Sequence, residues 1–308
     1  MSETSPLLVT GANGHLGRRI CQRIADSASG RPVRALVRSE RAAGQLQALP
    51  DAARPEIRIV DYADASQLSE AATGCDAAIH LVGILKETKH NRYENAHERP
   101  CEALAQAAEA AGLRRVVSLS ILGSDERSSN ACLASRARAD SILLAAKTPA
   151  VVIRVPMVLG EGDAASAALL RQSKGPSTKL VRGGATLEQP IAARDVVSAL
   201  LAAVDRPGIE DRVLDLAGPE SLSHRELVLR AANVLGTEVT IGSLPGAAAK
   251  GFAWLMEKLS SDPPLTSAML GVLEHDDQID PSPACEQLGI TLTPLDDALR
   301  EAFAETPA

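Results

Sequence analysis

The chain has 308 residues, of which 45% are hydrophobic and 23% are charged, a composition typical of a soluble globular protein. Asp and Glu number 39 against 32 Lys and Arg, so the formal net charge is −7 and the basic surface of a general nucleic-acid binder is excluded. No apolar run reaches the roughly 18 to 20 residues that span a bilayer, and none is typical of a signal peptide, so we expect a cytoplasmic protein without a transmembrane segment. The five cysteines form no Cys-x-x-Cys pair, which supports neither a disulfide framework nor a metal site.

Short runs of apolar, often β-branched residues alternate with stretches of helical period in the first half of the chain. The predicted strands are 7–10, 33–37, 57–60, 77–82, 116–120 and 151–155. Most are apolar throughout, which is typical of strands buried on both faces of a parallel sheet. Leu16, Ile20 and Ile24 recur every four residues and predict a helix over 16–25. The alternation predicts the α/β class, with a right-handed doubly wound parallel sheet of the Rossmann type.

The alternation of strands and helices changes after about Gly160. A glycine- and polar-rich stretch over 160–184 precedes a predicted helix near 194–204, an isolated strand near 213–216 and mostly helical segments. We therefore expect a Rossmann domain over 1–160 and a smaller, mostly helical lobe over 161–308 that closes over the sheet. Within that lobe, residues 190–218 are expected to pack back on the sheet.

The segment 10–17, Thr-Gly-Ala-Asn-Gly-His-Leu-Gly, joins the first predicted strand to the first helix. Gly11 permits a tight turn, Gly14 lets the backbone approach a pyrophosphate, and Gly17 lets the helix pack close to the strand. The free N–H groups at the start of the helix then face the anion, with help from the helix dipole. A purely structural turn is the alternative. The expected dinucleotide site consists of Thr10, Gly11, Asn13, Gly14, His15, Leu16 and Gly17.

The residue that follows the second strand distinguishes the two pyridine dinucleotides. An acidic side chain there would accept hydrogen bonds from the adenosine ribose, but the sequence has Arg38. A guanidinium matches a 2′-phosphate through paired hydrogen bonds, so NADP(H) is favoured over NAD(H). Asp61 and Tyr62 end the third strand, where they either line the adenine pocket or form a turn or cap before the next helix.

Together these motifs resemble the extended, atypical branch of the short-chain dehydrogenase/reductase family, in particular the members related to an accessory subunit of respiratory complex I. The segments that carry the resemblance are 10–17, Val60-Asp61-Tyr62, His-Leu-Val-Gly-Ile-Leu at 80–85, Ser-Ile-Leu-Gly at 120–123, Arg154-Val155-Pro156, 189–191, 194–196 and 216–220. The resemblance extends from Leu7 to about Leu299. It implies a Rossmann fold and an NAD(P) cofactor.

The resemblance also implies roles for individual positions. Leu81, Val82 and Gly83 would line the dinucleotide, and the backbone after Pro156 would hold the carboxamide of the nicotinamide. Ser120 would hydrogen-bond the substrate oxygen, and its near neighbour Ser118 is assigned to the cofactor side. An ordinary structural role in a strand is the alternative for each of them.

The family's catalytic pair is a tyrosine that exchanges a proton with the substrate and a lysine four residues later. Here Cys132 and Arg136 stand at those positions, on one face of a predicted helix. Arg136 can bind ribose hydroxyls but cannot lose a proton near neutral pH. Cys132 is either an acid, base or nucleophile with a lowered pKa, or a small half-buried residue without a catalytic role. Tyr62 and Tyr93 are too far along the chain to replace the tyrosine by a shift of register, so we expect the usual proton relay to be absent.

Four other polar residues are expected to have structural roles. His80 is interpreted as a hydrogen-bonded core residue and Asp163 as a turn residue. His97 either caps a helix or lines the cleft, without a metal partner at ligand spacing. Asp195 is expected to cap or anchor the helix near 194–204.

Aromatic residues make up only 2% of the chain, yet Phe252 and Trp254 lie close together in it. A predicted helix around them carries an apolar stripe of Phe252, Leu255, Met256 and Leu259. Packing of the smaller lobe onto the sheet is one explanation of this stripe. The other is an apolar cleft or a peripheral membrane contact, which would suit an isoprenoid or quinone-like substrate.

Two functions from different classes follow from these observations. The first is an NADP(H)-dependent oxidoreductase of a small or lipophilic carbonyl substrate, with Ser120, Cys132 and Arg136 as the candidate catalytic residues. The second is a non-catalytic dinucleotide-binding accessory subunit or redox sensor, which the loss of both the tyrosine and the lysine favours. A nucleotide-sugar epimerase or dehydratase is weaker, because it needs the missing tyrosine even more. Nothing in the sequence selects an oligomeric state.

Overall fold

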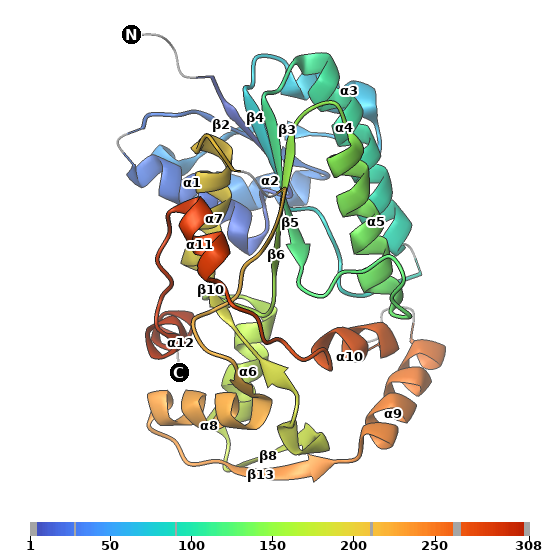
Figure 1. Cartoon of the computed structure of the whole chain (residues 1–308), viewed down its shortest axis with the longest axis vertical. Coiled ribbons are helices and arrows are strands. Elements are labelled where there is room, and N and C mark those ends of the chain that lie inside the picture. Colours follow the sequence, from blue (N-terminus) through green and yellow to red (C-terminus); the bar gives the residue numbers. More distant parts are fainter. Residues whose placement is uncertain (1–4, 28, 90, 210–211, 261–265, 305–308) are drawn as a thin grey trace.

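The computed structural model describes residues 5–27, 29–89, 91–209, 212–260 and 266–304. A seven-stranded sheet in the order β11-β6-β5-β4-β1-β2-β3, with every pair parallel, forms its centre (Figure 1). The strands are β1 (Leu7–Thr10), β2 (Val33–Val37), β3 (Glu56–Ile59), β4 (Ala77–His80), β5 (Arg115–Ile121), β6 (Ala150–Val155) and β11 (Val213–Asp215). This order is that of a doubly wound Rossmann sheet, so the predicted fold class is confirmed.

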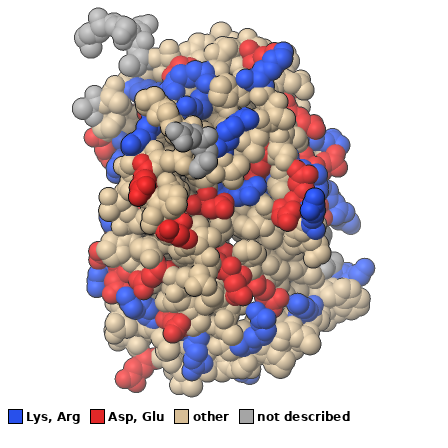
Figure 2. All heavy atoms as spheres, viewed as in Figure 1, with Lys and Arg blue, Asp and Glu red and all other residues tan. Residues whose placement is uncertain are grey.

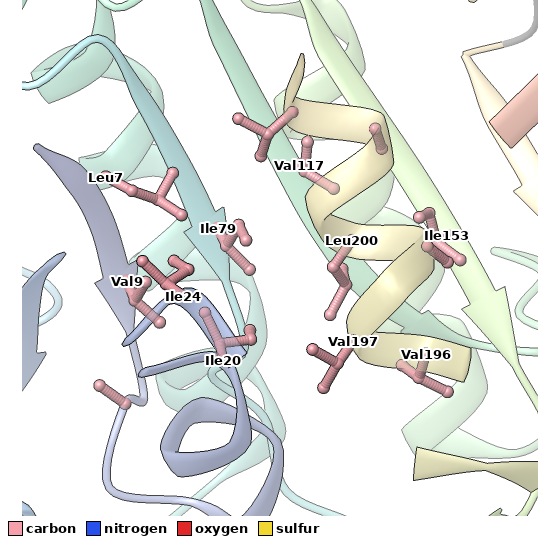
Figure 3. Packing of buried hydrophobic residues seen from close by; sticks show 14 of the residues in the cluster. Leu7, Val9, Ile20, Ile24, Ile79, Val117, Ile153, Val196, Val197 and Leu200 are labelled. Atoms are coloured by element: carbon pink, nitrogen blue, oxygen red, sulfur yellow. The ribbon is translucent and has the colours of Figure 1, made fainter. Parts of the chain in front are cut away.

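Helices cover both faces of this sheet. One face is covered by α1 (His15–Asp26), α2 (Glu40–Gln47), α7 (Ala193–Asp205) and α11 (Ser282–Leu288), and the other by α3 (Ala65–Ala72), α4 (Arg99–Ala111) and α5 (Ala131–Ala145). Figure 3 shows the first layer, where Ile20 and Ile24 of α1 lie beside Ile79 of β4, and Leu200 of α7 lies beside Ile153 of β6. Because strands β1, β4, β5 and β6 are buried on both sides, their positions relative to one another are held by two apolar layers.

Local signals in the sequence set several helix ends. The Asp64 carboxylate accepts the backbone N–H groups of Ser66 and Gln67 and begins α3. The Asn130 side chain accepts the N–H groups of Cys132 and Leu133 and begins α5, the helix that carries the candidate catalytic positions. The described residues also form short 3-10 turns, η1 (Asp51–Ala53) and η3 (Arg182–Gly184), and a π-helical turn, η2 (Glu94–Glu98).

A smaller lobe follows β6. Its elements are β7 (Val158–Leu159), α6 (Ala164–Lys174), β8 (Ser177–Val181), β9 (Leu187–Glu188), β10 (Ile191–Ala192), β12 (Leu222–Ser223), α8 (His224–Leu235), β13 (Thr240–Leu244), α9 (Gly246–Leu259), α10 (Ser267–Leu273) and α12 (Leu295–Phe303). The strands pair two by two, β7 with β10, β9 with β12 and β8 with β13. Helices α6, α8 and α12 share one apolar cluster. In the described part of the chain, no helix has the length and hydropathy needed to cross a membrane.

The strand expected near 213–216 is present as β11, but it is not isolated. Strand β11 pairs in parallel with β6, with Val213 opposite Val152, and is the seventh strand of the large sheet. A run of three residues is too short for its pattern to reveal a partner, and the free edge of β6 supplies that partner only in the folded chain. Helix α7 precedes β11 and packs on the same sheet. Residues 193–215 therefore belong to the large sheet and its helical layer, although the smaller lobe begins before them in the sequence.

Candidate functional site

The glycine turn between β1 and α1 has a backbone that other residues would not tolerate. Gly11 has a φ of +67°, in the left-handed region, and a Cβ there would lie 3.2 Å from the carbonyl carbon of Leu81. A Cβ on Gly17 would lie 2.4 Å from the carbonyl oxygen of Ala12, so glycine is needed for α1 to approach β1 this closely. The turn therefore presents bare backbone at the carboxyl end of β1, next to the point between β1 and β4 where the strand order reverses.

The first turn of α1 is open to an anion. Gly14 is its N-cap, no described side chain caps it, and its first turn carries no acidic residue. The exposed N–H groups and the helix dipole attract negative charge at this position. The Asn13 amide donates to Gln45 of α2 (Nδ2 to Oε1, 3.0 Å), and Arg18 donates to His15 (Nη2 to Nδ1, 3.3 Å). Burial, helped by the Arg18 cation, lowers the pKa of His15, so the imidazole is neutral at pH 7.

Arg38, Asp61 and Tyr62 lie just beyond the carboxyl ends of β2 and β3. Arg38 is exposed and forms no hydrogen bond or ion pair with any described residue. The Tyr62 hydroxyl accepts the N–H of Gly11 (2.9 Å) and donates to the carbonyl of Leu36 (2.7 Å), and burial raises the pKa of Tyr62 to about 12. Asp61 is exposed and accepts a backbone N–H within a turn, at Ala63. Tyr62 thus holds the glycine turn against β2, Asp61 serves a turn, and Arg38 is a cation available to a ligand.

A cleft of about 330 Å³ lies at the carboxyl ends of β4, β5 and β6. It is lined by five of the residues predicted to be catalytic or cofactor-binding: Leu81, Gly83, Ser120, Arg136 and Pro156. Most of the other lining residues are apolar: Ile84, Leu85, Leu119, Ile121, Leu122, Val155, Met157, Val158, Val272 and Leu273. Because Gly11 abuts the backbone of Leu81, a lining residue, the glycine turn lies beside the cleft.

Two buried nitrogens on the wall of this cleft have no hydrogen-bond partner among the described residues. They are Nε of Arg136 and Nδ1 of His97. Nη1 of Arg136 donates to the carbonyl of Val82 (2.9 Å), and the guanidinium lies against Gly83, where a Cβ would be 2.8 Å from Nη2. Nε2 of His97 lies 3.1 Å from the backbone N of Ile84 and 3.0 Å from its O. Buried polar atoms are normally hydrogen-bonded, so these two nitrogens are exceptions among the described residues, and both belong to residues that line the cleft.

His97 belongs to the π-helical turn η2 and is buried. Burial and the nearby Arg136 cation lower the pKa of His97 to about 3, so its imidazole is neutral and carries a single N–H. The ring stacks on Tyr93, with 5.4 Å between ring centroids. Of the two roles expected for His97, a helix cap or a place in the lining of the cleft, the structure shows the second.

Ser120 belongs to a buried polar network behind the cleft. Its hydroxyl donates to Oδ2 of Asp140 (2.8 Å), and Nε of Arg154 donates to the same oxygen (3.1 Å). Asp140 follows Arg136 by one turn of α5. Burial raises the pKa of Asp140, against the opposing effects of the Arg136 charge and of the Ser120 hydrogen bond. Ser120 can therefore accept a hydrogen bond in the cleft, but it can donate one to a substrate only by releasing Asp140.

Cys132 is fully buried, and its thiol donates to the carbonyl of Ile84 (Sγ to O, 3.7 Å). Burial raises the pKa of Cys132 to about 11 and outweighs the Arg136 charge, which gives no support to the hypothesis of a lowered pKa. The Tyr93 hydroxyl hydrogen-bonds the same thiol and also donates to the carbonyl of Leu85 (3.0 Å). The structure therefore favours the non-catalytic interpretation of Cys132, and it brings a tyrosine hydroxyl to this position from a distant segment.

Carboxylates contribute the remaining polar part of the cleft wall. They are Asp163, which caps α6, Glu188 of β9, and Asp277, which follows α10. Glu188 faces His224 (Oε1 to Nδ1, 3.3 Å) and Asp277 faces His275 (Oδ1 to Nδ1, 3.0 Å). Burial raises the pKa of Asp277 to about 6. Apolar side chains combined with carboxylates favour a neutral ligand over a phosphorylated one.

Three further residues singled out as cofactor-binding have side chains directed into the protein. Thr10 is paired with His80 across β1 and β4 (Oγ1 to Nδ1, 2.8 Å), Leu16 packs against the sheet core, and Ser118 is buried opposite His80 in β5. His80 is a hydrogen-bonded core residue, as its sequence context indicated. Asp195 anchors α7 by accepting the N–H and hydroxyl of Thr293.

Sequence reasoning missed Asp140, Tyr93 and the contribution of α10. Asp140 had a usable signal, because it follows Arg136 at the same four-residue spacing that separates Arg136 from Cys132. Tyr93 and α10 had none, since only the tertiary fold brings residues 93 and 272–273 to the ends of β4 and β5.

Comparison with known proteins gives relatives of two kinds. The chain is 29% identical, over 82% of its length and 79% of the relative's, to a 4-hydroxy-2-methyl-3-oxo-4-farnesyl-3,4-dihydroquinoline-1-oxide ketoreductase of Stigmatella aurantiaca. It is 26% identical, over 77% of its length and 73% of the relative's, to a ceramide reductase of Caulobacter vibrioides. It is 28% identical to the mitochondrial NADH dehydrogenase [ubiquinone] 1 alpha subcomplex subunit 9 of Arabidopsis thaliana, over 71% of this chain and 55% of that protein.

The fold recurs in solved structures. A UDP-glucuronic acid 4-epimerase from Bacillus cereus, in complex with NAD, superposes with a TM-score of 0.74 over 96% of both chains at 17% identity, which shows a shared fold. A family model described as NAD(P)H-binding matches residues 11–207, which run from the glycine turn through α7. With its parallel sheet, its glycine turn and these matches, the chain belongs to the NAD(P)H-binding family of atypical short-chain dehydrogenases/reductases.

Proposed function

We propose that this protein is an NADP(H)-dependent reductase of a neutral, lipophilic carbonyl compound. The observation that carries the proposal is the apolar cleft beside the glycine turn. Two of its lining residues, Arg136 and His97, each have a buried nitrogen without a described partner. The turn fits a dinucleotide, because its glycines leave room and its helix end is uncapped. When bound, the dinucleotide would supply the hydride.

The backbone of Gly11, Gly14 and Gly17 would hold the diphosphate. Arg38, exposed and without a partner among the described residues, would pair with a 2′-phosphate, which is the basis for proposing NADP(H). Arg136 lies against Val82 and Gly83, so its guanidinium would hold a hydroxyl or carbonyl oxygen near the reacting end.

Arg136 and His97 would polarise the substrate carbonyl together. Nη1 of Arg136 donates to Val82, and its buried Nε has no described partner. If Nε2 of His97 accepts the N–H of Ile84, the neutral ring carries its proton on Nδ1, which also lacks a described partner. Two unpaired donors in a largely apolar cleft would stabilise the negative charge that develops on a carbonyl oxygen. The buried Cys132 thiol is not part of this proposal, and we propose water as the source of the proton.

The lining of the cleft supports the proposed substrate class. Apolar side chains predominate, and the carboxylates Asp163, Glu188 and Asp277 would repel a substrate phosphate. The two bacterial relatives named above are reductases, one with a farnesyl-bearing compound in its name and one with ceramide. We therefore favour a neutral ketone or aldehyde with a long apolar group over a nucleotide sugar.

The cofactor proposal is tested by changing Arg38 to Ala. We expect the affinity for NADPH to fall by about tenfold or more while the affinity for NADH stays within about twofold, because only NADPH presents the second phosphate. Isothermal titration calorimetry measures both affinities. Arg41→Ala removes another exposed arginine of the same segment and serves as the matched control. Equal weakening of both dinucleotides in the Arg38 variant would remove the argument for NADP(H).

The catalytic proposal is tested by following NADPH oxidation with a panel of neutral long-chain ketones, short α-keto acids and nucleotide sugars. Turnover confined to the first group, together with its loss in His97→Phe and retention in Cys132→Ala, would support the reductase. A second function has a specific observation in its favour, since Ser120 and Cys132 are both engaged within the protein. Tight NADPH binding without turnover of any compound would favour this second function, a dinucleotide-binding accessory subunit.

A further inference from the structure

Helix α9 keeps its large apolar side chains on the outside of the molecule. Four of them are exposed: Phe252 (52%), Trp254 (57%), Leu255 (44%) and Leu259 (72%). The side of α9 that faces the protein is made of alanine, and Ala249 and Ala253 form a small buried cluster with Leu270 of α10. This is the reverse of an ordinary surface helix, which buries its large apolar residues. The explanation that the stripe packs the smaller lobe onto the sheet is therefore wrong.

These four side chains define what we call the outer face of α9. In Figure 1, α9 lies at the lower right edge of the molecule, and α10 lies between it and the large sheet. The same corner in Figure 2 is largely without charged groups and ends in a cationic side chain. Trp254 is flanked one turn before and one turn after by Lys250 and Lys258, both exposed. The outer face therefore consists of two leucines, a phenyl ring and an indole ring, and two lysines border it, of which Lys250 pairs with Glu274 (Nζ to Oε2, 3.4 Å).

The apolar surface continues from α9 toward the cleft. Helix α10 packs on α9, and its Leu273 is 48% exposed while also lining the cleft. Leu85, on the wall of the same cleft, is 52% exposed. Of the eight exposed large apolar residues in the described chain, Phe252, Trp254, Leu255, Leu259 and Leu273 belong to α9 and α10. The outer face of α9 is thus separated from the mouth of the cleft by α10, which carries an exposed leucine of its own.

We propose that the outer face of α9 docks on the surface of a phospholipid bilayer that carries anionic headgroups. A helix with such a face lies in the plane of the interface, with its apolar residues below the headgroups. Indole rings favour this interface, and lysines extend their ammonium groups toward lipid phosphates while their stems cover apolar surface. A second copy of this chain would oppose Lys258 of α9 with the same positive charge, whereas an anionic headgroup would pair with it.

Docking would place the mouth of the cleft beside the membrane. A lipophilic compound held in the bilayer could then pass over α10 into the cleft without crossing water. This consequence rests on the proposed function, whereas docking rests on the exposed face of α9 alone.

The test uses the single tryptophan of the chain, Trp254, as its own probe. The full-length protein is titrated with vesicles of phosphatidylcholine and phosphatidylglycerol, and with vesicles of phosphatidylcholine alone. We expect the Trp254 emission to shift to the blue, to be quenched by lipids brominated near the headgroup end of the acyl chain, and to respond more strongly to the anionic vesicles. Sedimentation with the vesicles gives the partition coefficient.

A triple variant, Phe252→Ser, Leu255→Ser and Leu259→Ser, removes the other three apolar side chains of the outer face and retains Trp254. We expect its partition coefficient to fall by more than about tenfold, because three apolar side chains that would be partly buried in the bilayer are replaced by serine. Leu229→Ser on α8 changes an exposed leucine (42%) elsewhere and should bind vesicles like the unchanged protein. Unaltered melting temperature and NADPH affinity, both measured without lipid, show that the triple variant is folded.

Three results would overturn the docking proposal: no spectral change with either kind of vesicle, an equal partition coefficient in the triple variant, or a blue shift that depends on protein concentration and not on lipid. The last would assign the face to a second copy of the chain. Loss of NADPH binding with intact vesicle binding would instead overturn the proposed function and leave the docking proposal standing.

Discussion

The glycine turn and the far wall of the neighbouring cleft are built in different ways. At the glycine turn, backbone meets backbone, and a single added Cβ on Gly17 would lie within 2.5 Å of two Ala12 atoms, O and Cα. The far wall, formed by α10 and the segments around Glu188 and Asp277, consists of apolar and acidic side chains. The glycine turn cannot accommodate an added side chain unless α1 moves away from the sheet, whereas the side chains of the far wall can change rotamer.

This difference indicates what each of the two regions can recognise. A rigid backbone cradle selects one chemical group, a diphosphate, because its N–H groups have fixed directions. A wall of leucine, isoleucine, valine and methionine selects by polarity and size, so that related proteins can accept different compounds. Substitutions in the glycine turn should therefore lower NADPH affinity more than substitutions in the far wall of the cleft.

The largest effect is expected from Gly17→Ala. The added methyl would overlap the Ala12 backbone, so we expect a loss of about 1–3 kcal/mol in the free energy of unfolding and a fall in NADPH affinity of about a hundredfold or more. Gly44→Ala is the matched control, because a Cβ at Gly44 in α2 meets nothing within 4 Å and alanine favours helix. Denaturant unfolding and calorimetry measure both quantities. If Gly17→Ala bound NADPH as well as Gly44→Ala does, the backbone of this turn would not be the diphosphate site.

Arg136→Met should have the next largest effect, because it retains length and apolar contact but removes the charge and the donor at Nε. We expect the NADPH affinity to fall by about tenfold and turnover by more, since a hydrogen bond from a charged donor contributes about 1.5–3 kcal/mol. Arg138→Met, two residues along α5, removes an exposed ion pair with Glu98 and should change stability by less than about 1 kcal/mol. Single-turnover kinetics separates binding from hydride transfer. Identical kinetics in the two variants would exclude Arg136 from the site.

The smallest effect on NADPH affinity is expected from Asp277→Asn, in the far wall of the cleft, and this substitution has a separate effect on stability. Burial raises the pKa of Asp277 from 3.8 to about 6, so the folded protein holds this proton more tightly than the unfolded chain does. The free energy of unfolding should therefore decrease as the pH rises from about 4 to about 6, and the decrease should be absent in the Asn variant. Melting temperatures between pH 4 and pH 7 measure it. Asp280→Asn is the contrast, because a hydrogen bond from Ser282 lowers the pKa of Asp280 and reverses the sign.

A steeper loss of stability with rising pH in Asp277→Asn than in the unchanged protein would contradict the burial of that carboxylate. The three substitutions should therefore lower NADPH affinity progressively less from the rigid glycine turn to the adaptable far wall of the cleft. If Asp277→Asn disturbed NADPH binding more than Gly17→Ala did, the comparison between the two regions would be reversed.

Much of the large domain could be predicted from its residues. Apolar runs such as Leu7–Thr10 and the four-residue period of Leu16, Ile20 and Ile24 indicate a buried strand and an amphipathic helix, and both are local properties of the chain. Asp277 and Leu273 carry no such signal, because their place on the cleft wall depends on the path of the chain through the smaller lobe. The same holds for Tyr93, which reaches the Cys132 thiol from 39 positions earlier in the sequence.

The sequence by itself determined the Rossmann sheet, the glycine turn and the replacement of the family's catalytic pair by Cys132 and Arg136, because spacing and residue type are sufficient for each. The tertiary structure alone decided that the Cys132 thiol is buried with a raised pKa and that Ser120 donates to Asp140, since burial and partner choice are set by residues far apart in the chain. It also decided that the large side chains of α9 lie outside, because periodicity identifies an apolar stripe but not which side of the helix meets the rest of the protein.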